Sequence, residues 1–254
     1  MLEKAEGIVL RTIAYGENNV ILRIYTREAG KISVMARGAK KPKNKLSAAA
    51  QPFVYGMFLY YKGSGMSTLS QGDNIDSFRI IRDDIVKTAY ASYMSELLDK
   101  LTDEKERNPY LFELFLQLLQ KMNEDDDPEV LTRIFETKMM QQAGITPELN
   151  QCVRCKRKEG TFSFSVKEAG FLCHHCKGID EYRFDIHQKT VQLLRTFFYM
   201  DMKRLGNVAL KQSTKTELRQ VLQTYYDEYT GIFLKSRRFL EQMENWSMKT
   251  DDKP

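Results

Sequence analysis

The sequence predicts an α+β protein with an N-terminal β-barrel followed by a mainly α-helical region. Three observations predict this class. Short alternating apolar segments separated by Gly, Asn and Ser fill the first 80 of the 254 residues. Apolar positions at helical spacing follow from Asp83 onward. Two Cys-x-x-Cys pairs interrupt the helical part and flank a segment that reads as a small hairpin. Alternation is typical of strands, whereas a 3.6-residue period is typical of helices.

Five segments in the first 80 residues are expected to be strands. Turn residues such as Tyr15-Gly16-Glu17-Asn18 and Arg27-Glu28-Ala29-Gly30 separate the first three. Five strands in about 70 residues suit an OB-like barrel. An SH3-like barrel fits the same count almost as well. The expected strands are residues 6–14, 20–26, 31–36, 53–61 and 66–70.

The segment between the third and fourth strands is strongly basic. It has five positive charges in nine residues and no acid, and both Gly38 and Pro42 disfavour regular structure. Such side chains can pair with phosphates and release counterions. The alternative is a solvated loop whose lysines keep a sheet edge soluble. The basic residues are Arg37, Lys40, Lys41, Lys43 and Lys45.

Charge is unevenly distributed along the chain, although the net charge is only +5. Residues 1–80 carry 12 basic and 6 acidic side chains, and residues 81–150 carry 8 and 15. Residues 151–254 carry 19 and 13. An acidic middle between two basic ends indicates that one or both ends face a polyanion. An uneven but merely solvated surface is the alternative.

The helical region contains recognisable start and stop signals. Asn108-Pro109 and Asp127-Pro128 each pair a capping side chain with a proline at the first helical position. Gly144 is expected to end a helix in a left-handed conformation. The predicted organisation is an OB-fold domain at 1–80, helical parts at 81–150 and 180–246, a cysteine insert at 151–179, and a polar tail at 247–254.

The cysteine pairs are the most specific local motif. Cys152-Val153-Arg154-Cys155 is followed, after seventeen residues, by Cys173-His174-His175-Cys176. Two residues between cysteines let a tight turn aim both sulfurs at one ion, so two such turns predict a four-cysteine zinc site. Four thiolates leave no open position, which indicates a structural ion. A redox dithiol is the alternative. We expect His174 and His175 to face solvent or to surround the ligands, and the alternative is that one of them substitutes for a sulfur.

Signals for catalysis and for membranes are absent from the sequence. It holds three histidines, two of them inside the cysteine motif, and none of GxSxG, HExxH or GxxxxGK[ST]. We therefore expect a protein that is not an enzyme, although an enzyme acting on nucleic acid is an alternative. No run of about 18 apolar residues occurs, and the start of the chain is polar. We expect that the protein does not contact membranes. We also expect it to be cytoplasmic and associated with the nucleoid.

Several segments together resemble the bacterial RecO family of DNA repair proteins, which are recombination mediators. The resemblance covers nearly the whole chain, and the order and spacing of the segments make it specific. They are Glu6-Gly7-Ile8-Val9-Leu10-Arg11, Tyr15-Gly16-Glu17, Gly30-Lys31, Arg37-Gly38-Ala39-Lys40-Lys41, Gln51-Pro52-Phe53, Ala143-Gly144-Ile145-Thr146-Pro147 and the two cysteine pairs. Cysteines are not universal in the family, so the zinc prediction depends on this sequence's own spacing.

The resemblance implies an N-terminal OB-fold, a helical body and a zinc-binding segment. It also implies binding of single- and double-stranded DNA, annealing of complementary strands, and no nucleotide hydrolysis. The implied partners are RecR, single-strand-binding protein and, indirectly, RecA, which the family helps to load onto coated strands.

Basic and aromatic side chains of the barrel are the candidates for DNA contact. OB barrels combine a cationic groove with aromatic stacking platforms. Tyr55, Phe58, Tyr60 and Tyr61 are candidate platforms, and alternation places about half of them in the core. The predicted DNA-binding residues are Arg11, Arg27, Lys31, Arg37, Lys40, Lys41, Lys43 and Lys45. The predicted metal ligands are Cys152, Cys155, Cys173 and Cys176. A zinc-containing adaptor whose basic loop binds an acidic protein is the alternative function.

Overall fold

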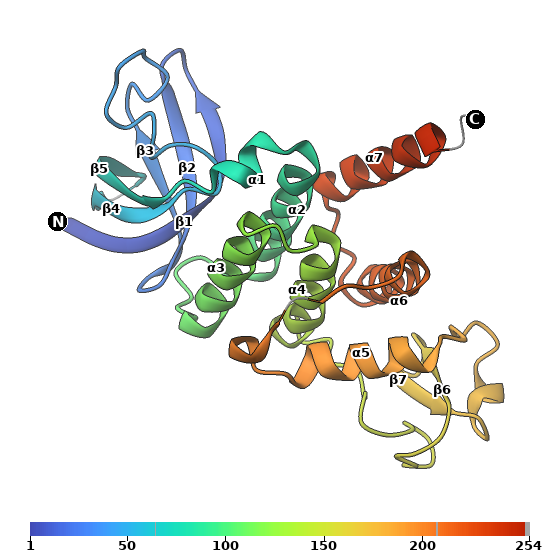
Figure 1. Cartoon of the computed structure of the whole chain (residues 1–254). Coiled ribbons are helices and arrows are strands. Elements are labelled where there is room, and N and C mark those ends of the chain that lie inside the picture. Colours follow the sequence, from blue (N-terminus) through green and yellow to red (C-terminus); the bar gives the residue numbers. More distant parts are fainter. Residues whose placement is uncertain (64, 207, 252–254) are drawn as a thin grey trace. The chain divides into compact units, whose positions relative to one another are not determined.

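Figure 1 shows the computed structural model, which describes residues 1–63, 65–206 and 208–251. The chain forms two compact units. The first holds Met1–Asp125 together with the chain from Leu234 onward, and the second holds Asp126–Phe233. The predicted domain boundaries follow changes of secondary structure rather than these units, and that division of the chain stays a prediction.

The N-terminal strands close into a barrel, as the sequence predicts. The order around the barrel is β1-β2-β3-β5-β4, and β1 returns to pair with β4. The β3–β5 pair is parallel and the other pairs are antiparallel. This arrangement is OB-like and not SH3-like. The strands are β1 (Leu2–Tyr15), β2 (Asn19–Thr26), β3 (Gly30–Ala36), β4 (Tyr55–Tyr61) and β5 (Ser67–Asp76).

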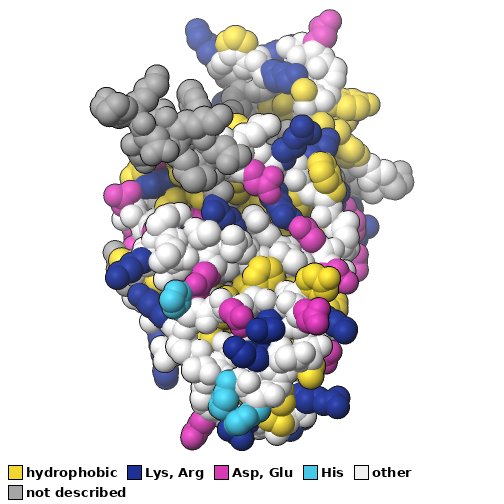
Figure 2. Space-filling view, turned by 90° about the vertical axis from the view of Figure 1, so that its right-hand side faces the viewer, with side chains coloured by type: hydrophobic (Ala, Val, Ile, Leu, Met, Phe, Trp, Pro, Cys, Tyr) yellow, Lys and Arg dark blue, Asp and Glu magenta, His cyan; other side chains and the backbone are white. Residues whose placement is uncertain are grey.

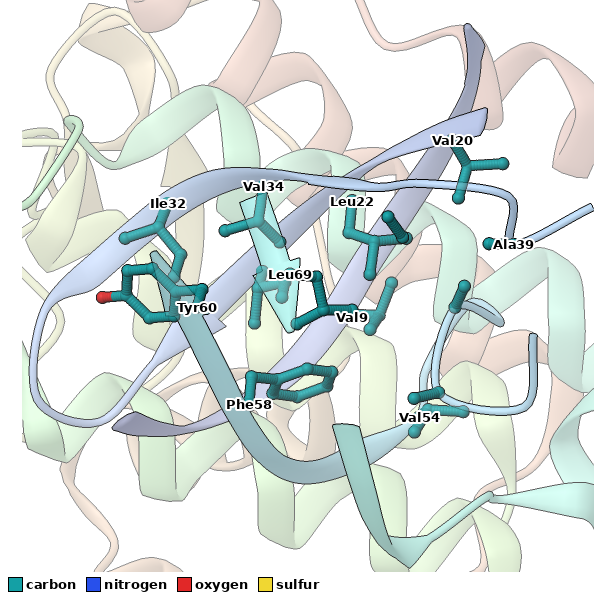
Figure 3. Packing of buried hydrophobic residues seen from close by; sticks show 14 of the residues in the cluster. Val9, Val20, Leu22, Ile32, Val34, Ala39, Val54, Phe58, Tyr60 and Leu69 are labelled. Atoms are coloured by element: carbon teal, nitrogen blue, oxygen red, sulfur yellow. The ribbon is translucent and has the colours of Figure 1, made fainter. Parts of the chain in front are cut away.

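Inward-facing side chains of these strands fill the barrel (Figure 3). Alternate positions of β4 and of most of β2 are buried, since successive strand side chains point to opposite faces. Val9, Leu22, Val34 and Phe58 are completely buried, and Leu69 of β5 packs among them. The barrel interior is therefore packed core, so any ligand must use its outer surface.

Four helices belong to the same unit as the barrel: α1 (Arg79–Asp83), α2 (Ile85–Leu101), α3 (Pro109–Asn123) and α7 (Lys235–Asp251). Side chains cap α2 and α3, and the cap of α3 is the one that the sequence indicates. The Asn108 side chain accepts a hydrogen bond from the Leu111 amide at 3.0 Å. Asp84 accepts bonds from the amides of Val86 and Lys87 and so starts α2. Each bond satisfies an amide that has no partner within its helix.

The element bounds differ from the predicted ones at several points. Strand β4 begins at Tyr55 because Phe53 turns away with a φ of 67°. Strand β5 continues to Asp76, and the short helix α1 was not predicted. Helix α7 continues through Asp251, past residue 246, because this segment contains neither Gly nor Pro. Residues 252–254 of the predicted tail lie outside the described residues.

The second unit combines three helices with a small hairpin. The elements are α4 (Pro128–Gln142), β6 (Phe162–Ser165), β7 (Gly170–Cys173), α5 (Gln188–Tyr199) and α6 (Gln212–Thr230). Strands β6 and β7 pair antiparallel. The Phe164 ring meets Phe171 edge-on at 5.9 Å and Tyr225 of α6 at 5.5 Å. Aromatic packing therefore fixes the hairpin to the helices of its own unit.

The helices in the described part of the chain are too short or too polar to cross a bilayer.

Candidate nucleic-acid interface and metal centre

The basic loop, residues 37–54, connects β3 to β4 and presents its charges to solvent. Its five cations are exposed, and none forms an ion pair with any residue that the structure describes. Uncompensated cations on one loop raise the local positive potential and attract polyanions. The cations are Arg37, Lys40, Lys41, Lys43 and Lys45.

Hydrogen bonds and buried alanines hold this loop against the barrel. The Gly38 amide donates to the Asn19 side chain at 2.8 Å, and the Lys40 amide donates to the Asn18 carbonyl at 3.0 Å. Within the loop, the Ser47 hydroxyl donates to the Ala39 carbonyl at 2.6 Å. Ala39, Ala49 and Ala50 are buried in the barrel core. The backbone is thus fixed while the cationic side chains stay free, so binding costs less ordering of the chain.

The sequence indicates the cations of this loop but not the residues that hold it. Asn18 and Asn19 read as turn residues, and Ala39 and Ala49 read as loop alanines. The spacing of three small apolar residues around the cations is the signal that could have indicated an anchored loop.

The four candidate stacking aromatics separate as alternation requires. Phe58 and Tyr60 are buried at 0% and 3% exposure. Tyr55 is half-buried, and its hydroxyl donates to Glu6 at 2.5 Å. Tyr61 is 56% exposed. Of the four, Tyr61 is therefore the one whose ring is available to a base.

Strand register fixes the position of Tyr61 relative to the basic loop. Tyr61 pairs with Thr68 of β5, and Thr68 pairs with Met35 of β3. Two strand spacings correspond to about 10 Å. Tyr61 also pairs with Leu2 at the start of β1, whereas Asn18 and Asn19, beyond the end of β1, hold the basic loop. Figure 3 likewise shows Tyr60 beside Ile32 and away from Ala39. The aromatic platform and the cationic loop therefore lie toward different ends of the barrel.

The prediction that Lys31 contacts DNA is contradicted by its burial. Its side chain is 4% exposed. The ammonium donates to the Thr102 carbonyl at 2.6 Å and to the Asp99 carbonyl, and it lies 3.2 Å from the Asp99 carboxylate. A cation held by helix α2 in this way is not available to a phosphate.

Arg27 is also engaged within the protein. Its guanidinium donates two hydrogen bonds to Glu6, at 2.8 and 3.1 Å, and one to Glu113 of α3 at 2.9 Å. It lies over the Phe112 ring at 4.6 Å. Burial of the Glu6 carboxyl would raise its pKa, but the bonds from Arg27 and Tyr55 outweigh burial and lower it. Arg27 thus joins the barrel to α3, and a DNA contact by Arg27 stays a prediction.

Arg11 is the remaining predicted strand residue, and it is exposed. Its guanidinium lies 3.2 Å from the Asp99 carboxylate, with 56% of the side chain accessible. One face of the guanidinium can therefore still meet a ligand.

The four cysteines lie together, as their spacing predicts. Their sulfur atoms are all within 4.8 Å of one another, and Cys155 Sγ lies 3.6 Å from Cys173 Sγ. A tetrahedron with Zn–S bonds of about 2.3 Å has sulfur–sulfur edges of about 3.8 Å. All four cysteines are free, and Cys152 and Cys173 are fully buried. The cluster could therefore hold one metal ion, and the donor set is compatible with zinc.

The local backbone already favours a thiolate at one of these positions. Burial would raise the pKa of Cys152, but backbone amides of Cys155, Cys173 and Arg154 point at its sulfur and lower the pKa to about 6. Burial and its sulfur neighbours raise the pKa of Cys176 to about 12. Four adjacent sulfurs resist simultaneous ionisation unless a cation lies between them.

Basic side chains surround the cysteine cluster. Figure 2 shows Lys and Arg gathered around the two adjacent histidines at the bottom of the view. The rings of His174 and His175 are 3.9 Å apart, and both side chains are exposed. The exposed cations near the knuckles are Arg154, Lys156, Arg157, Lys158 and Lys177.

These features define a class of protein: an OB-like barrel with a basic loop, joined to helices that carry a cysteine cluster with metal-site geometry. Comparison with known families agrees with that class. The family model described as Recombination protein O N terminal matches residues 1–78, and the model described as Recombination protein O C terminal matches residues 82–238.

Relatives of the same family match nearly the full length of the chain. The DNA repair protein RecO of Bacillus subtilis (strain 168) is 57% identical over 245 residues, covering 96% of each chain. The protein of the same name from Halalkalibacterium halodurans is 52% identical over 96% of each chain. That of Bacillus mycoides is 51% identical over 98% of this chain and 100% of its own. The chain therefore belongs to the RecO family of DNA repair proteins.

Proposed function

We propose that this protein is a recombination mediator in DNA repair that binds single- and double-stranded DNA without sequence preference. The observation that carries the proposal is the anchored basic loop, whose five exposed cations have no acidic partner in the described chain. Contacts to phosphates supply affinity but no sequence information. Binding at this loop would therefore be insensitive to sequence and sensitive to salt.

The exposure of Tyr61 supports binding to single strands in particular. An exposed ring and a cationic loop on one barrel offer both components of a single-strand site, the stacking platform and the electrostatic groove. Annealing of two complementary strands needs no chemical step. A cationic surface that holds both strands lowers their repulsion and raises their local concentration.

Membership of the family supports the partners that we propose. The protein would act with RecR on DNA coated by single-strand-binding protein, and it would help to load RecA there. Such a protein works on chromosomal DNA, so we place it in the cytoplasm at the nucleoid. We propose no catalytic residue.

We further propose that Cys152, Cys155, Cys173 and Cys176 hold one structural zinc ion. Their sulfur spacing supports this, and so do the backbone amides directed at Cys152. Bound zinc would supply a rigid cross-link between the two knuckles and leave no open coordination position. Exposed cations such as Arg154 and Lys177 would balance the negative charge of the four thiolates.

Fluorescence anisotropy of labelled oligonucleotides across a salt series tests the DNA proposal. If about five phosphates are contacted, log Kd on single strands should change with log salt with a slope of magnitude about 3.5. A variant with Lys40, Lys41, Lys43 and Lys45 changed to Ala should lose most of this slope. Affinity should be similar for oligonucleotides of unrelated sequence.

A matched control distinguishes DNA binding at the loop from a general effect of the protein's net charge. Lys4, Lys105, Lys167 and Lys189 are exposed and lie elsewhere. Changing these four to Ala removes the same charge and should leave the slope within about one unit of wild type. Equal losses in both variants, or no DNA binding by folded wild type at low salt, would refute binding at the loop.

A further inference from the structure

A pocket of about 590 Å³ lies on the outside of the barrel, beside α2 and the start of α7. We call it the α2 pocket, and define it by Arg11, Pro52, Ser92, Ser95, Lys100 and Lys235, which line it. The volume is in the range of pockets that bind small ligands. Every lining residue belongs to the unit that contains the barrel.

The two carboxylates of the pocket already have partners in the protein. Glu96 accepts hydrogen bonds from the amides of Lys235 and Ser236, at 3.1 and 2.8 Å, and from the Ser236 hydroxyl. Asp99 accepts a bond from Arg23 at 2.9 Å. The Glu96 carboxylate thus has hydrogen-bond donors within the fold, and the charge of Asp99 is paired with Arg23. The ammonium groups of Lys100 and Lys235 are exposed and have no ion pair among the described residues, so the pocket presents positive charge to a ligand.

The hydroxyl of Ser95 is an independent observation that points to a ligand. Its side chain lines the pocket and is 3% exposed, and its hydroxyl has no hydrogen-bond partner in the described part of the chain. A buried hydroxyl without a partner lowers stability. Rotation about its side-chain bond can turn the hydroxyl toward a ligand oxygen, and an oxyanion would satisfy it.

Part of the pocket lining is apolar. A β-bulge at Leu10, where the β1–β2 register shifts between Val9 and Arg11, places Leu10 in the pocket lining. Pro52 and the buried Phe53 complete this part of the lining. A lining that combines apolar side chains with cations suits a nucleotide, which joins a sugar and a base to a phosphate.

Strand β1 connects this pocket to the basic loop. Beyond the bulge, Arg11, Ile13 and Tyr15 lie on one face of β1, and Ile13 and Tyr15 are 40% and 52% exposed. Tyr15 pairs with Asn19, whose side chain accepts the bond from Gly38 of the loop. Four strand steps cover about 13 Å. That length matches roughly four stacked nucleotides at about 3.4 Å each.

We infer that the α2 pocket receives a nucleotide of the DNA strand that the basic loop holds, with its phosphate near Lys100, Lys235 and Ser95. The inference rests on the proposed function and extends it to a second contact point. An acidic peptide would use the same cations. The exposed aromatic and aliphatic side chains of β1, which run from the loop to the pocket, favour a continuous strand instead.

Titration of a labelled oligothymidine of 15 nucleotides tests the inference. Changing both Lys100 and Lys235 to Ala should weaken binding about tenfold and reduce the salt slope by about 1.4, since each lost phosphate contact removes about 0.7. Ser95→Ala should weaken binding several-fold and leave the melting temperature equal to or above that of wild type. A purely structural serine would lower the melting temperature without a specific effect on DNA.

Oligonucleotide length and a control variant make the result decisive. A strand of two nucleotides spans about 7 Å when stacked and cannot reach from the loop to the pocket, so the pocket variants should weaken its binding less than that of the 15-nucleotide strand. Lys4→Ala, which removes an exposed charge from another part of β1, should have little effect on either oligonucleotide.

If the loop variant loses DNA binding while all pocket variants retain it, the pocket inference is wrong and the proposed function stands. If wild type binds neither oligonucleotide, both are wrong. If an acidic peptide binds wild type and the Lys100 and Lys235 changes abolish that binding while DNA binding is unchanged, the pocket binds protein and not DNA.

Discussion

The ammonium of Lys31 lies 3.2 Å from the carboxylate of Asp99, with 4% and 9% of the two side chains exposed. The same ammonium donates to the carbonyls of Asp99 and Thr102 at the end of helix α2. Carbonyls in the last helical turn have no partner within the helix, and a cation there is stabilised by the helix dipole. Lys31 thus joins strand β3 to α2 and is part of the fold.

Replacing Lys31 with Ala should destabilise the protein by about 2–4 kcal/mol, because it leaves buried acceptors and part of the Asp99 charge without a partner. DNA affinity at a temperature where the variant is folded should be unchanged. Urea denaturation combined with anisotropy measures both quantities. Lys40→Ala provides the matched comparison, with weaker DNA binding and unchanged stability. A stable Lys31→Ala variant with weakened DNA binding would restore Lys31 as a contact.

Asp99 should make stability depend on pH in the acidic range. Burial would raise the pKa of its carboxyl, but hydrogen bonds and charges of Arg23 and Lys31 outweigh burial and lower the pKa below the ordinary 3.8. Near neutral pH the Asp99 carboxylate is ionised in both the folded and the unfolded chain, so its full contribution to the free energy of unfolding is present. As pH falls below about 3.8, the unfolded chain takes up the proton first, and the contribution disappears as pH passes through the folded pKa.

Asp99→Asn should therefore be less stable than wild type by about 2–4 kcal/mol at pH 7, since it leaves the buried Lys31 uncompensated. The difference in unfolding free energy should shrink below pH 3.8. Denaturant titrations of both proteins between pH 7 and pH 3 measure it. Other carboxylates titrate in both proteins and so cancel in the difference. A difference that stays constant over this range would contradict the assignment.

The contacts of Lys31 and Arg27 show how far sequence alone can predict this site. Strand alternation indicates that a side chain points out of the barrel, but it does not indicate whether a helix covers that face. Asp99, which engages Lys31, lies 68 residues further along the chain. Glu113, which engages Arg27, lies 86 residues further. No local pattern encodes contacts at such separations.

The cysteine cluster could be predicted because its information is local. Two turns each fix a pair of sulfurs, and the hairpin between Phe162 and Cys173 brings the pairs together. The exposed loop cations could be predicted for the same reason. Neither the buried alanines that anchor the loop nor the unpartnered Ser95 hydroxyl gives such a signal, since each depends on how distant segments pack.

Tyr61→Ala should weaken binding of single-stranded DNA without a loss of stability. Stacking of a base on an aromatic ring contributes about 1–3 kcal/mol per base, so the expected loss is about tenfold at one stacked base. Anisotropy with a single-stranded oligonucleotide measures this change. Tyr60→Phe is the control on the same strand, because Tyr60 is buried and its hydroxyl bonds Glu3 at 2.9 Å. Tyr60→Phe should lower the stability of the protein slightly and leave its affinity for DNA unchanged. Unchanged single-strand affinity in Tyr61→Ala would exclude the ring as a platform.

Removal of the proposed zinc ion should destabilise the unit that contains the cysteines and spare the DNA contacts of the barrel loop. The purified protein is expected to contain one zinc per chain by elemental analysis. Cys152→Ser should lose that zinc, because a serine hydroxyl does not replace a thiolate ligand. Its melting temperature should fall. DNA affinity at low temperature should stay within about twofold, since the cysteines belong to residues 126–233 and the loop does not.

Changing both His174 and His175 to Ala tests whether a histidine takes part in binding the metal. Both histidines are exposed and lie between two of the cysteines in sequence, yet the four sulfurs alone complete a tetrahedral set. This variant should keep one zinc per chain and a melting temperature close to that of wild type. Loss of zinc from it, with zinc retained in Cys155→Ser, would show that a histidine and not Cys155 completes the site. Zinc absent from freshly purified wild type would instead favour a dithiol function for the four cysteines.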